Sequence, residues 1–417
     1  MTSDSVSPPA KSGNLNFVLV SIFIDMLGIG LIIPVMPVLV GEFVNGKDAQ
    51  TLWFGVLTSV FGLMQFFFMP MLGAISDRVG RRPVLLYSMA GMCLNFLMTA
   101  WAPTLGFLLA GRVIGGMSSA SMSVASAYAA DISTHENRAK SFGKVGAAFG
   151  LGFICGPMLG GLLGDKNLHL PFYVAAALSA TNFIYGYFFV PESLDQARRK
   201  PVELARINPF TALIKLAKRV DVRGLVIVFA LSALAQMMLQ TTWVLYTTFR
   251  FHWTPLDNGI ALFCVGLTAA IVQAGLLALL LKRLGEVRVA LIGLASGGIT
   301  YLLYGLATQG WMMYVLILCN MLAFAAGPAL QGVISKATPP EEQGELMGSL
   351  QSIQSLGVVF MPLLGTAVLA RGTHLAAGDW RIGTTFFVCA AMQAVAFFVA
   401  GRYFKSHHYA SPEPVKV

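Results

Sequence analysis

The sequence predicts an all-α membrane protein in which twelve transmembrane helices form two pseudo-symmetric bundles of six. Composition is the first reason, because the 417-residue chain is 56% hydrophobic and only 11% charged, whereas a soluble domain carries about 25% charged residues. An internal repeat is the second reason, because residues recur without slippage at an offset of 205 positions. Apolar runs of membrane-spanning length are the third.

The internal repeat divides the chain into two equivalent halves. Its identical pairs are Arg78/Arg283, Gly80/Gly285, Glu136/Glu341, Gly143/Gly348, Gly152/Gly357, Pro157/Pro362 and Gly160/Gly365. Duplicated membrane units commonly pack about a pseudo-two-fold axis and place a binding site between them near the bilayer midplane. The repeat therefore predicts a transporter.

Apolar runs of about 20 residues can cross roughly 30 Å of hydrocarbon, and the chain contains twelve of them. Those of the first half are 15–40, 52–75, 83–101, 105–130, 142–163 and 171–190. Those of the second half are 224–248, 259–281, 288–308, 311–334, 345–370 and 382–404. We predict an N-terminal bundle at 1–190, a polar linker at 191–223 and a C-terminal bundle at 224–417. The second part of the linker could form an amphipathic helix on the membrane surface.

Lysine and arginine set the predicted orientation. With Arg112 set aside as intramembrane, 22 of the remaining 27 lie in the termini and in the loops of one side. Because positive residues stay in the cytoplasm, both termini are expected there, with the protein in a cell inner membrane. The net charge of +9 is therefore a topology signal, and no nucleic-acid partner is expected.

Several patterns exclude other classes of protein. The five cysteines lie in apolar runs without CxxC spacing, so neither a disulfide framework nor a zinc site is expected. No GxxxxGK(S/T) phosphate loop occurs, which leaves an ion gradient as the energy source. All six histidines lie in loops or in the tail, so the spans lack the residues of a membrane-embedded enzyme or sensor. We expect no metal, no cofactor and no enzyme activity.

Two charged residues lie away from the ends of the spans, Asp25 in the first and Arg112 in the fourth. An intramembrane charge is a functional-site hypothesis by default. Counting 1.5 Å per residue from the helix ends places both near one level of the bilayer. They could be a neutralising pair that only holds two helices together. Alternatively, Asp25 binds and releases a proton, and Arg112 favours its charged form in one conformation.

The first span also contains GIGLIIPVMP (28–37), with two glycines and two prolines. Proline removes a backbone hydrogen bond and kinks a helix. The segment therefore predicts a kink, which is either static or a hinge beside the proton site.

The loop after the second span reads GAISDRVGRRP (73–83) and resembles the G-x-L-x-D-R-x-G-R-R-P signature of the major facilitator superfamily. The resemblance implies the fold of that superfamily and a cytoplasmic latch between the two halves. The latch residues are Gly73, Asp77, Arg78, Gly80, Arg81 and Arg82, together with Asp131 and Arg138. By this resemblance Asp77 sits near the N-terminus of the eleventh helix, where the dipole favours an anion, and Arg81 meets Asp131. The alternative is that these residues only set topology.

The fifth span contains GLGFICGPMLGG (150–161), which is similar to the glycine-rich GP motif of the drug/proton antiporter branch. The motif residues are Gly152, Gly156, Pro157, Gly160 and Gly161. A helix-packing face accounts for the glycines but less well for the Gly-Pro pair. We therefore favour the antiporter interpretation.

Nearly the whole chain resembles the tetracycline/proton antiporters of Gram-negative bacteria, for example at IDMLGIGLIIPVMPVL (24–39) and QGELMGSLQSIQSL (343–356). The resemblance implies that Asp25 is the family's first-helix Asp and Gln65 its substrate-pocket Gln. The chain departs from the family where the third-helix Asp is Asn95 and where an eighth-helix His falls at about Ala269. Because an amide cannot titrate or hold a cation as a carboxylate does, a metal–tetracycline chelate is expected to be a poor substrate.

Together these features predict a monomeric, proton-coupled antiporter that exports amphiphilic small molecules across the bilayer by alternating access. The central cavity is expected to be lined by Asp25, Gln65, Asn95, Arg112, Gln236, Gln240, Trp243, Asn320, Gln351 and Gln354. For each glutamine and for Trp243, polar contact between helices is an equally good explanation. A proton-coupled importer of a metabolite on the same fold is the alternative function, and the GP motif argues against it.

Overall fold

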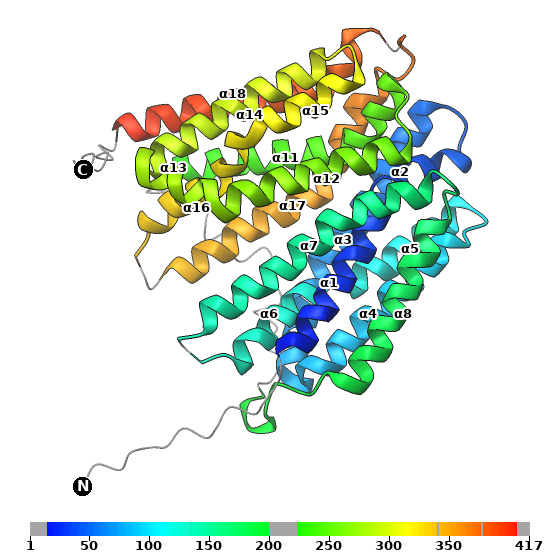
Figure 1. Ribbon diagram of the computed structural model, residues 1–417, viewed down its shortest axis with the longest axis vertical. Coiled ribbons are helices and arrows are strands. Elements are labelled where there is room, and N and C mark those ends of the chain that lie inside the picture. The colour runs from blue at the N-terminus through cyan, green and yellow to red at the C-terminus, as the bar shows by residue number, and fades with distance from the viewer. Residues whose placement is uncertain (1–14, 135, 200–222, 340–341, 377, 407–417) are drawn as a thin grey trace.

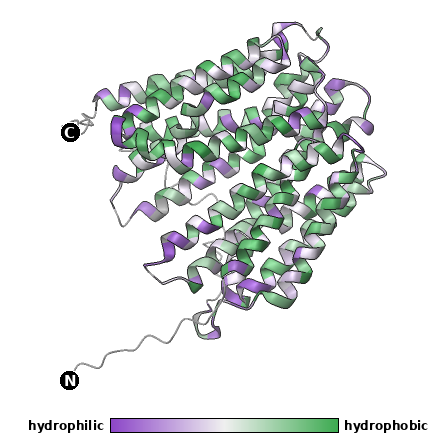
Figure 2. Cartoon of the chain, in the orientation of Figure 1, coloured by the Kyte–Doolittle hydropathy of each residue, from purple (hydrophilic) through white to green (hydrophobic). Residues whose placement is uncertain are grey.

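The computed structural model describes residues 15–134, 136–199, 223–339, 342–376 and 378–406. The described residues form helices and no strands, and twelve helical segments are long and apolar enough to cross a membrane. Figure 2 shows hydrophobic residues along the lengths of these helices and hydrophilic residues mainly toward their ends. The predicted amphipathic helix of the linker lies outside the described residues.

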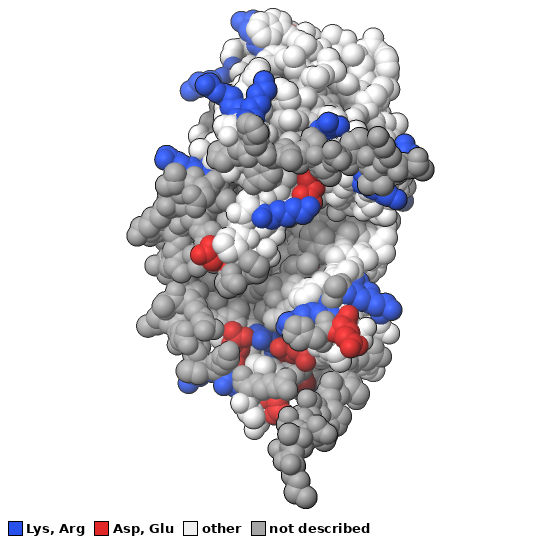
Figure 3. Space-filling model, turned by 90° about the vertical axis from the view of Figure 1, so that its left-hand side faces the viewer, with Lys and Arg blue, Asp and Glu red and all other residues white. Residues whose placement is uncertain are grey.

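An even number of spans brings Leu15 and Ser406 to the same end of the molecule (Figure 1). We call this the inner end, because its lysines and arginines predict that it faces the cytoplasm. Figure 3 looks onto the inner end and shows basic side chains over both halves.

The N-terminal half contains six spans. Its elements are α1 (Leu15–Ile32), α2 (Met36–Leu39), η1 (Val40–Glu42), α3 (Lys47–Val79), α4 (Arg81–Ala100), α5 (Leu105–Ser118), α6 (Ser121–Ile132), α7 (Arg138–Gly164) and α8 (Leu170–Phe189). Helix α1 packs on α7 and α8, and α4 packs on α5 and α8. A short 3₁₀ turn, η2 (Gln196–Arg198), follows the sixth span.

The C-terminal half repeats this arrangement. Its elements are α11 (Arg223–Phe251), α12 (Pro255–Ile271), the π-helix η3 (Val272–Leu276), α13 (Leu277–Leu284), α14 (Glu286–Leu306), α15 (Gly310–Cys319), η4 (Asn320–Ala325), α16 (Ala326–Lys336), α17 (Gln343–Ala370), η6 (Trp380–Gly383) and α18 (Thr384–Ser406). Helix α11 packs on α17 and α18, and α14 packs on α18.

Three predicted spans are interrupted by a break or by a 3₁₀ segment, and the eighth contains the π-helix η3. The first was expected to continue to residue 40, but α1 ends at Ile32, because Pro34 has no N–H to continue the helical ladder. The fourth span breaks at Ser119–Ala120 between α5 and α6. The tenth span changes to the 3₁₀ segment η4, which includes the positions 205 residues after the break at Ser119–Ala120. The repeat therefore extends to these interruptions.

The two halves meet mainly through α3 against α17 and α7 against α12. These contacts lie toward the outer end. There a Cβ added to Gly62 would lie 2.7 Å from the carbonyl oxygen of Val358, and one added to Gly161 would lie 2.5 Å from that of Pro255. Toward the inner end, Gly146 and Gly348 have no atoms within 4 Å of such a Cβ. The structure is therefore closed at the outer end and open at the inner end.

Candidate functional site

A cavity of about 830 Å³ lies between the halves and is lined from the N-terminal half mainly by α1, α3, α4, α6 and α7, and from the C-terminal half mainly by α17. Its apolar wall contains the methionines Met26, Met69, Met92, Met122 and Met237 and the phenylalanines Phe61, Phe66, Phe96, Phe149 and Phe153. Its neutral polar groups are Gln65, Ser119, Ser121, Ser123, Ser179, Gln351, Ser352, Gln354 and Ser355. Flexible methionines suit surfaces that accommodate varied ligands, and this volume fits a drug-sized molecule.

Asp25 is the one charged side chain among the described residues that line this cavity. It is 6% exposed, and its carboxylate accepts a hydrogen bond from Asn182 Nδ2 at 2.7 Å. The side chain of Ser121 also hydrogen-bonds it. Asp25 has two neutral hydrogen-bond partners, and its side chain also faces the cavity. It can therefore exchange a proton with the cavity.

Arg112 is not paired with Asp25, although the two were expected to lie at one level. Its Nε and Nη2 atoms have no hydrogen-bond partner among the described residues, and its guanidinium lies 5.9 Å from the centre of the Phe61 ring. Asp25 contacts Ser121, at the start of α6, whereas Arg112 lies nine residues earlier on α5. At 1.5 Å per residue that is about 13 Å farther outward.

Three of the predicted glutamines line the cavity. Gln65 donates a hydrogen bond from Nε2 to Ser119 Oγ at 3.0 Å, next to the interruption of the fourth span. Gln351 and Gln354 line the opposite wall on α17. Together with Asp25 they form the predicted site that the structure brings together.

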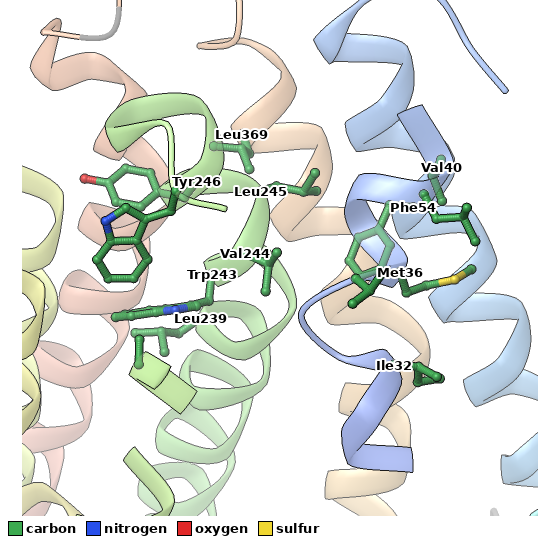
Figure 4. Packing of buried hydrophobic residues seen from close by; sticks show 14 of the residues in the cluster. Ile32, Met36, Val40, Phe54, Leu239, Trp243, Val244, Leu245, Tyr246 and Leu369 are labelled. Carbon is green, nitrogen blue, oxygen red and sulfur yellow. The ribbon is translucent and has the colours of Figure 1, made fainter. Parts of the chain in front are cut away.

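The other predicted lining residues lie outside this cavity. Gln236 accepts a 2.5 Å hydrogen bond from the Tyr301 hydroxyl within the C-terminal half, and Gln240 is exposed without lining the cavity. Asn95 is fully buried between helices α4 and α5 and Asn320 is 7% exposed. Trp243 packs edge-on against Tyr304 and Phe386 and points away from Met36 and Phe54 of the other half (Figure 4).

These five residues do not line the cavity in this conformation, and the helices that carry them are apolar on nearly every side. Sequence periodicity then cannot tell which face turns toward the cavity. For Gln236 the alternative, polar contact between helices, is what the structure shows. Trp243 packs on aromatic rings, and its indole N–H has no hydrogen-bond partner among the described residues.

The latch residues gather at the inner end of the N-terminal half. Arg81 contacts Asp131, as expected, with Nε 3.0 Å from Oδ2. Its Nη1 lies 2.6 Å from Asp77 Oδ1, so Asp77 is paired within its own half in this conformation. Arg78 and Arg138 are exposed, while Gly73 lines the cavity.

Glu192 is a member of this cluster that the sequence analysis missed. Its carboxylate accepts hydrogen bonds from the backbone N–H groups of Arg81 at 2.8 Å and Arg82 at 3.2 Å, at the start of α4. Gly80 has φ +114° and no room for a Cβ beside Glu192. A glutamate directly after the sixth span was the available signal, because carboxylates stabilise helix N-termini.

The C-terminal half carries a charge-reversed copy of the Arg81–Asp131 pair. Glu286 and Lys336 stand 205 positions after those two residues, and Glu286 Oε1 lies 2.9 Å from Lys336 Nζ. Here the anion is at a helix N-terminus and the cation at a helix C-terminus, the arrangement that helix dipoles favour. In the N-terminal half the same positions carry the disfavoured signs.

The glycines of the GP motif face two different partners. Gly152 and Gly156 pack against α1, where their added Cβ atoms would lie 2.6 Å from Phe23 O and Gly30 Cα. Gly160 also faces α1, against the Leu31 carbonyl, whereas Gly161 faces α12 across the interface between halves. The motif therefore combines packing within one half with contact between halves.

Adjacent substitutions separate these two contacts. Gly160→Val should clash with the α1 backbone and reduce the yield of folded protein several-fold, because backbone atoms cannot move aside cheaply. Gly161→Val should fold but open the outer end, because that clash is relieved when the halves part there. To detect opening, a cysteine is introduced as Thr366→Cys, at a position buried beside Gly55. Its labelling by a membrane-impermeant maleimide is measured in a protein from which the five native cysteines have been removed. Equal losses of folded protein would contradict the division of roles.

Two six-helix halves around a cavity that is open at one end and sealed at the other define a membrane transporter of the alternating-access class. The sequence matches the Major Facilitator Superfamily over residues 18–362, with a second match over 225–416. The chain belongs to this superfamily.

Relatives and solved structures cover nearly the whole chain. It is similar to the tetracycline resistance protein, class C, of Escherichia coli, at 37% identity over 91% of this chain and 96% of that protein. It is also similar to multidrug resistance protein 2 of Bacillus subtilis (strain 168), at 30% identity over 85% and 88% of the two chains. The crystal structure of the human organic anion transporter MFSD10 (TETRAN) covers 94% of this chain and 100% of that one, with TM-score 0.67 and 25% identity.

Proposed function

We propose that this protein is a proton-coupled antiporter that exports amphiphilic small molecules, as a monomer, with both termini in the cytoplasm. The observation that carries the proposal is Asp25, a lone acid on the wall of a methionine- and phenylalanine-lined cavity that is open to the inner end. The similarity to tetracycline and multidrug resistance proteins supports export of drug-like molecules. Residence in an inner membrane follows from the same relatives.

The mechanism is competition between proton and substrate. In the inward-open state a deprotonated Asp25 offers one negative charge to a substrate that enters from the cytoplasm. After the halves rock, a proton from outside neutralises Asp25 and the substrate leaves. One proton entering at roughly 150 mV contributes about 3.5 kcal/mol, which supports a substrate gradient on the order of a few hundred-fold.

Proteoliposomes test the coupling directly. An imposed pH gradient, acidic on the outer side, should drive an amphiphilic dye toward that side, and an ionophore that collapses the gradient should stop it. A metabolite importer would instead accumulate its substrate on the inner side under the same gradient. Dye movement that is indifferent to the gradient would contradict proton coupling.

The latch gives a separable prediction. Asp77→Asn and Arg81→Cys should each slow transport about tenfold or more while changing the substrate dissociation constant less than about threefold. The reason is that these residues bias the conformational equilibrium and do not line the cavity. The matched control is Lys144→Gln, which changes an exposed basic residue of the inner end that is not a latch residue. A latch variant that weakens binding as much as transport would show that the residue acts on the substrate site.

A further inference from the structure

The guanidinium of Arg112 is a buried cation without a counter-ion. It is 7% exposed, and two of its nitrogens have no hydrogen-bond partner among the described residues. The face of Phe61 offers weak cation–π attraction at 5.9 Å. That contact leaves the guanidinium's unpaired N–H donors without acceptors, and an unpaired intramembrane charge is strongly unfavourable. Arg112 therefore needs an acceptor that the described part of the chain does not supply.

A second unpartnered polar side chain lies on the neighbouring helix α4 and contacts the segment of α5 that carries Arg112. Asn95 is fully buried on α4, and within the described part of the chain neither its Oδ1 nor its Nδ2 has a hydrogen-bond partner. Asn95 lies against Gly111 and Gly115, on either side of Arg112 along α5. Two adjacent helices thus place unused hydrogen-bond donors in one region. Buried polar groups are normally paired, so this region has the character of a binding site rather than of a packed core.

Phe61 connects this region to the cavity. Its ring lines the cavity and also contacts Arg112, which does not itself line the cavity. A rotation of the Phe61 side chain would expose the guanidinium to a molecule already in the cavity. Asp25 lies about 13 Å farther inward. A substrate in the cavity would therefore meet the negative carboxylate of Asp25 at one level and the positive guanidinium of Arg112 at another.

We propose that Arg112, with the amide of Asn95, binds the carboxylate or enolate oxygen of the transported molecule behind Phe61. This inference rests on the proposed export function and specifies its substrate class. A dipolar amphiphile with a cationic and an acidic group satisfies Asp25 and Arg112 together, which a simple monocation does not. Charge-assisted hydrogen bonds to a guanidinium are the strong ones, so the acid contributes affinity as well as orientation.

Rhodamine 110 and rhodamine 123 test this assignment, because they share one xanthene cation and differ only in a carboxylate against its methyl ester. Binding to the purified full-length protein at pH 7.5 is measured by fluorescence anisotropy. We expect wild type to bind the acid about tenfold more tightly than the ester, the gain typical of one charge-assisted hydrogen bond. Arg112→Gln should bind the two dyes within about threefold of each other. Arg381→Gln, which removes an exposed outer arginine, is the matched control.

Two further variants keep the test decisive if Arg112→Gln does not fold. Asn95→Asp places a carboxylate beside Arg112 and should abolish the preference for the acid. Phe61→Ala should speed association of the acid more than that of the ester, because it uncovers the guanidinium for the acid alone. Equal affinity of wild type for the two dyes, or a preference for the acid that survives in Asn95→Asp, would overturn the proposal. Proton-driven export by the wild type is measured in parallel, so a wild type that exports normally but shows no preference for the acid contradicts this inference alone.

Discussion

Replacing Asp25 by asparagine is expected to abolish transport driven by a pH gradient while leaving the protein folded and inserted. The amide keeps the shape of the carboxylate and can still accept the hydrogen bond from Asn182. It cannot bind and release a proton, and no other acid lines the cavity among the described residues. The measurement is dye accumulation in proteoliposomes under an imposed pH gradient.

Counterflow separates coupling from translocation in the same variant. Exchange of labelled for unlabelled substrate needs no net proton movement, so Asp25→Asn should still catalyse it, provided that the substrate tolerates a neutral site. Asp165→Asn, which changes an exposed acid of an outer loop, serves as the control and should retain pH-driven transport. Undiminished pH-driven transport by an inserted Asp25→Asn protein would exclude Asp25 as the proton carrier.

The fold was predictable from the sequence because span length and hydropathy are local properties. All twelve predicted spans are present, and the 205-residue repeat reappears as equivalent interruptions of the fourth and tenth spans. The interruption at Ser119–Ala120 was itself not predicted. The expected level of Arg112 failed because the fourth span, Leu105–Ile132, is 28 residues long, so a residue near its outer end lies farther from the inner end than a span of about 30 Å would place it.

The site residues were predictable only as far as the avoidance of lipid by polar side chains determines their position. Gln65, Gln351 and Gln354 line the cavity as expected, since polar groups on mostly apolar helices tend to turn away from lipid. Gln236 and Trp243 on α11 satisfy the same rule by packing inside the C-terminal half. Sequence does not distinguish these two interior environments, because the choice depends on helix rotation and on which end of the molecule is open.

The charge of the cavity sets the second large expected effect. With Asp25 as the one charged group that lines it among the described residues, a dicationic amphiphile brings a second charge without a partner. An unpaired charge at the bilayer centre costs about 2.5–3.5 kcal/mol on insertion scales, which corresponds to roughly a hundredfold loss of transport efficiency. A matched neutral, monocationic and dicationic series measures this in proteoliposomes.

The neutral and monocationic members of that series should be exported, each against about one proton. The dication should be transported about a hundredfold less efficiently than the monocation. A metal–tetracycline chelate should also be a poor substrate, because Asn95 is buried, neutral and outside the cavity. A dication-tolerant cavity would need a second anion, and Ser179→Asp, on the lining of the same wall, supplies one. That variant should recover dication export at the expense of the neutral compound. Efficient dication export by the wild type would mean that a second carboxylate reaches the cavity during the cycle.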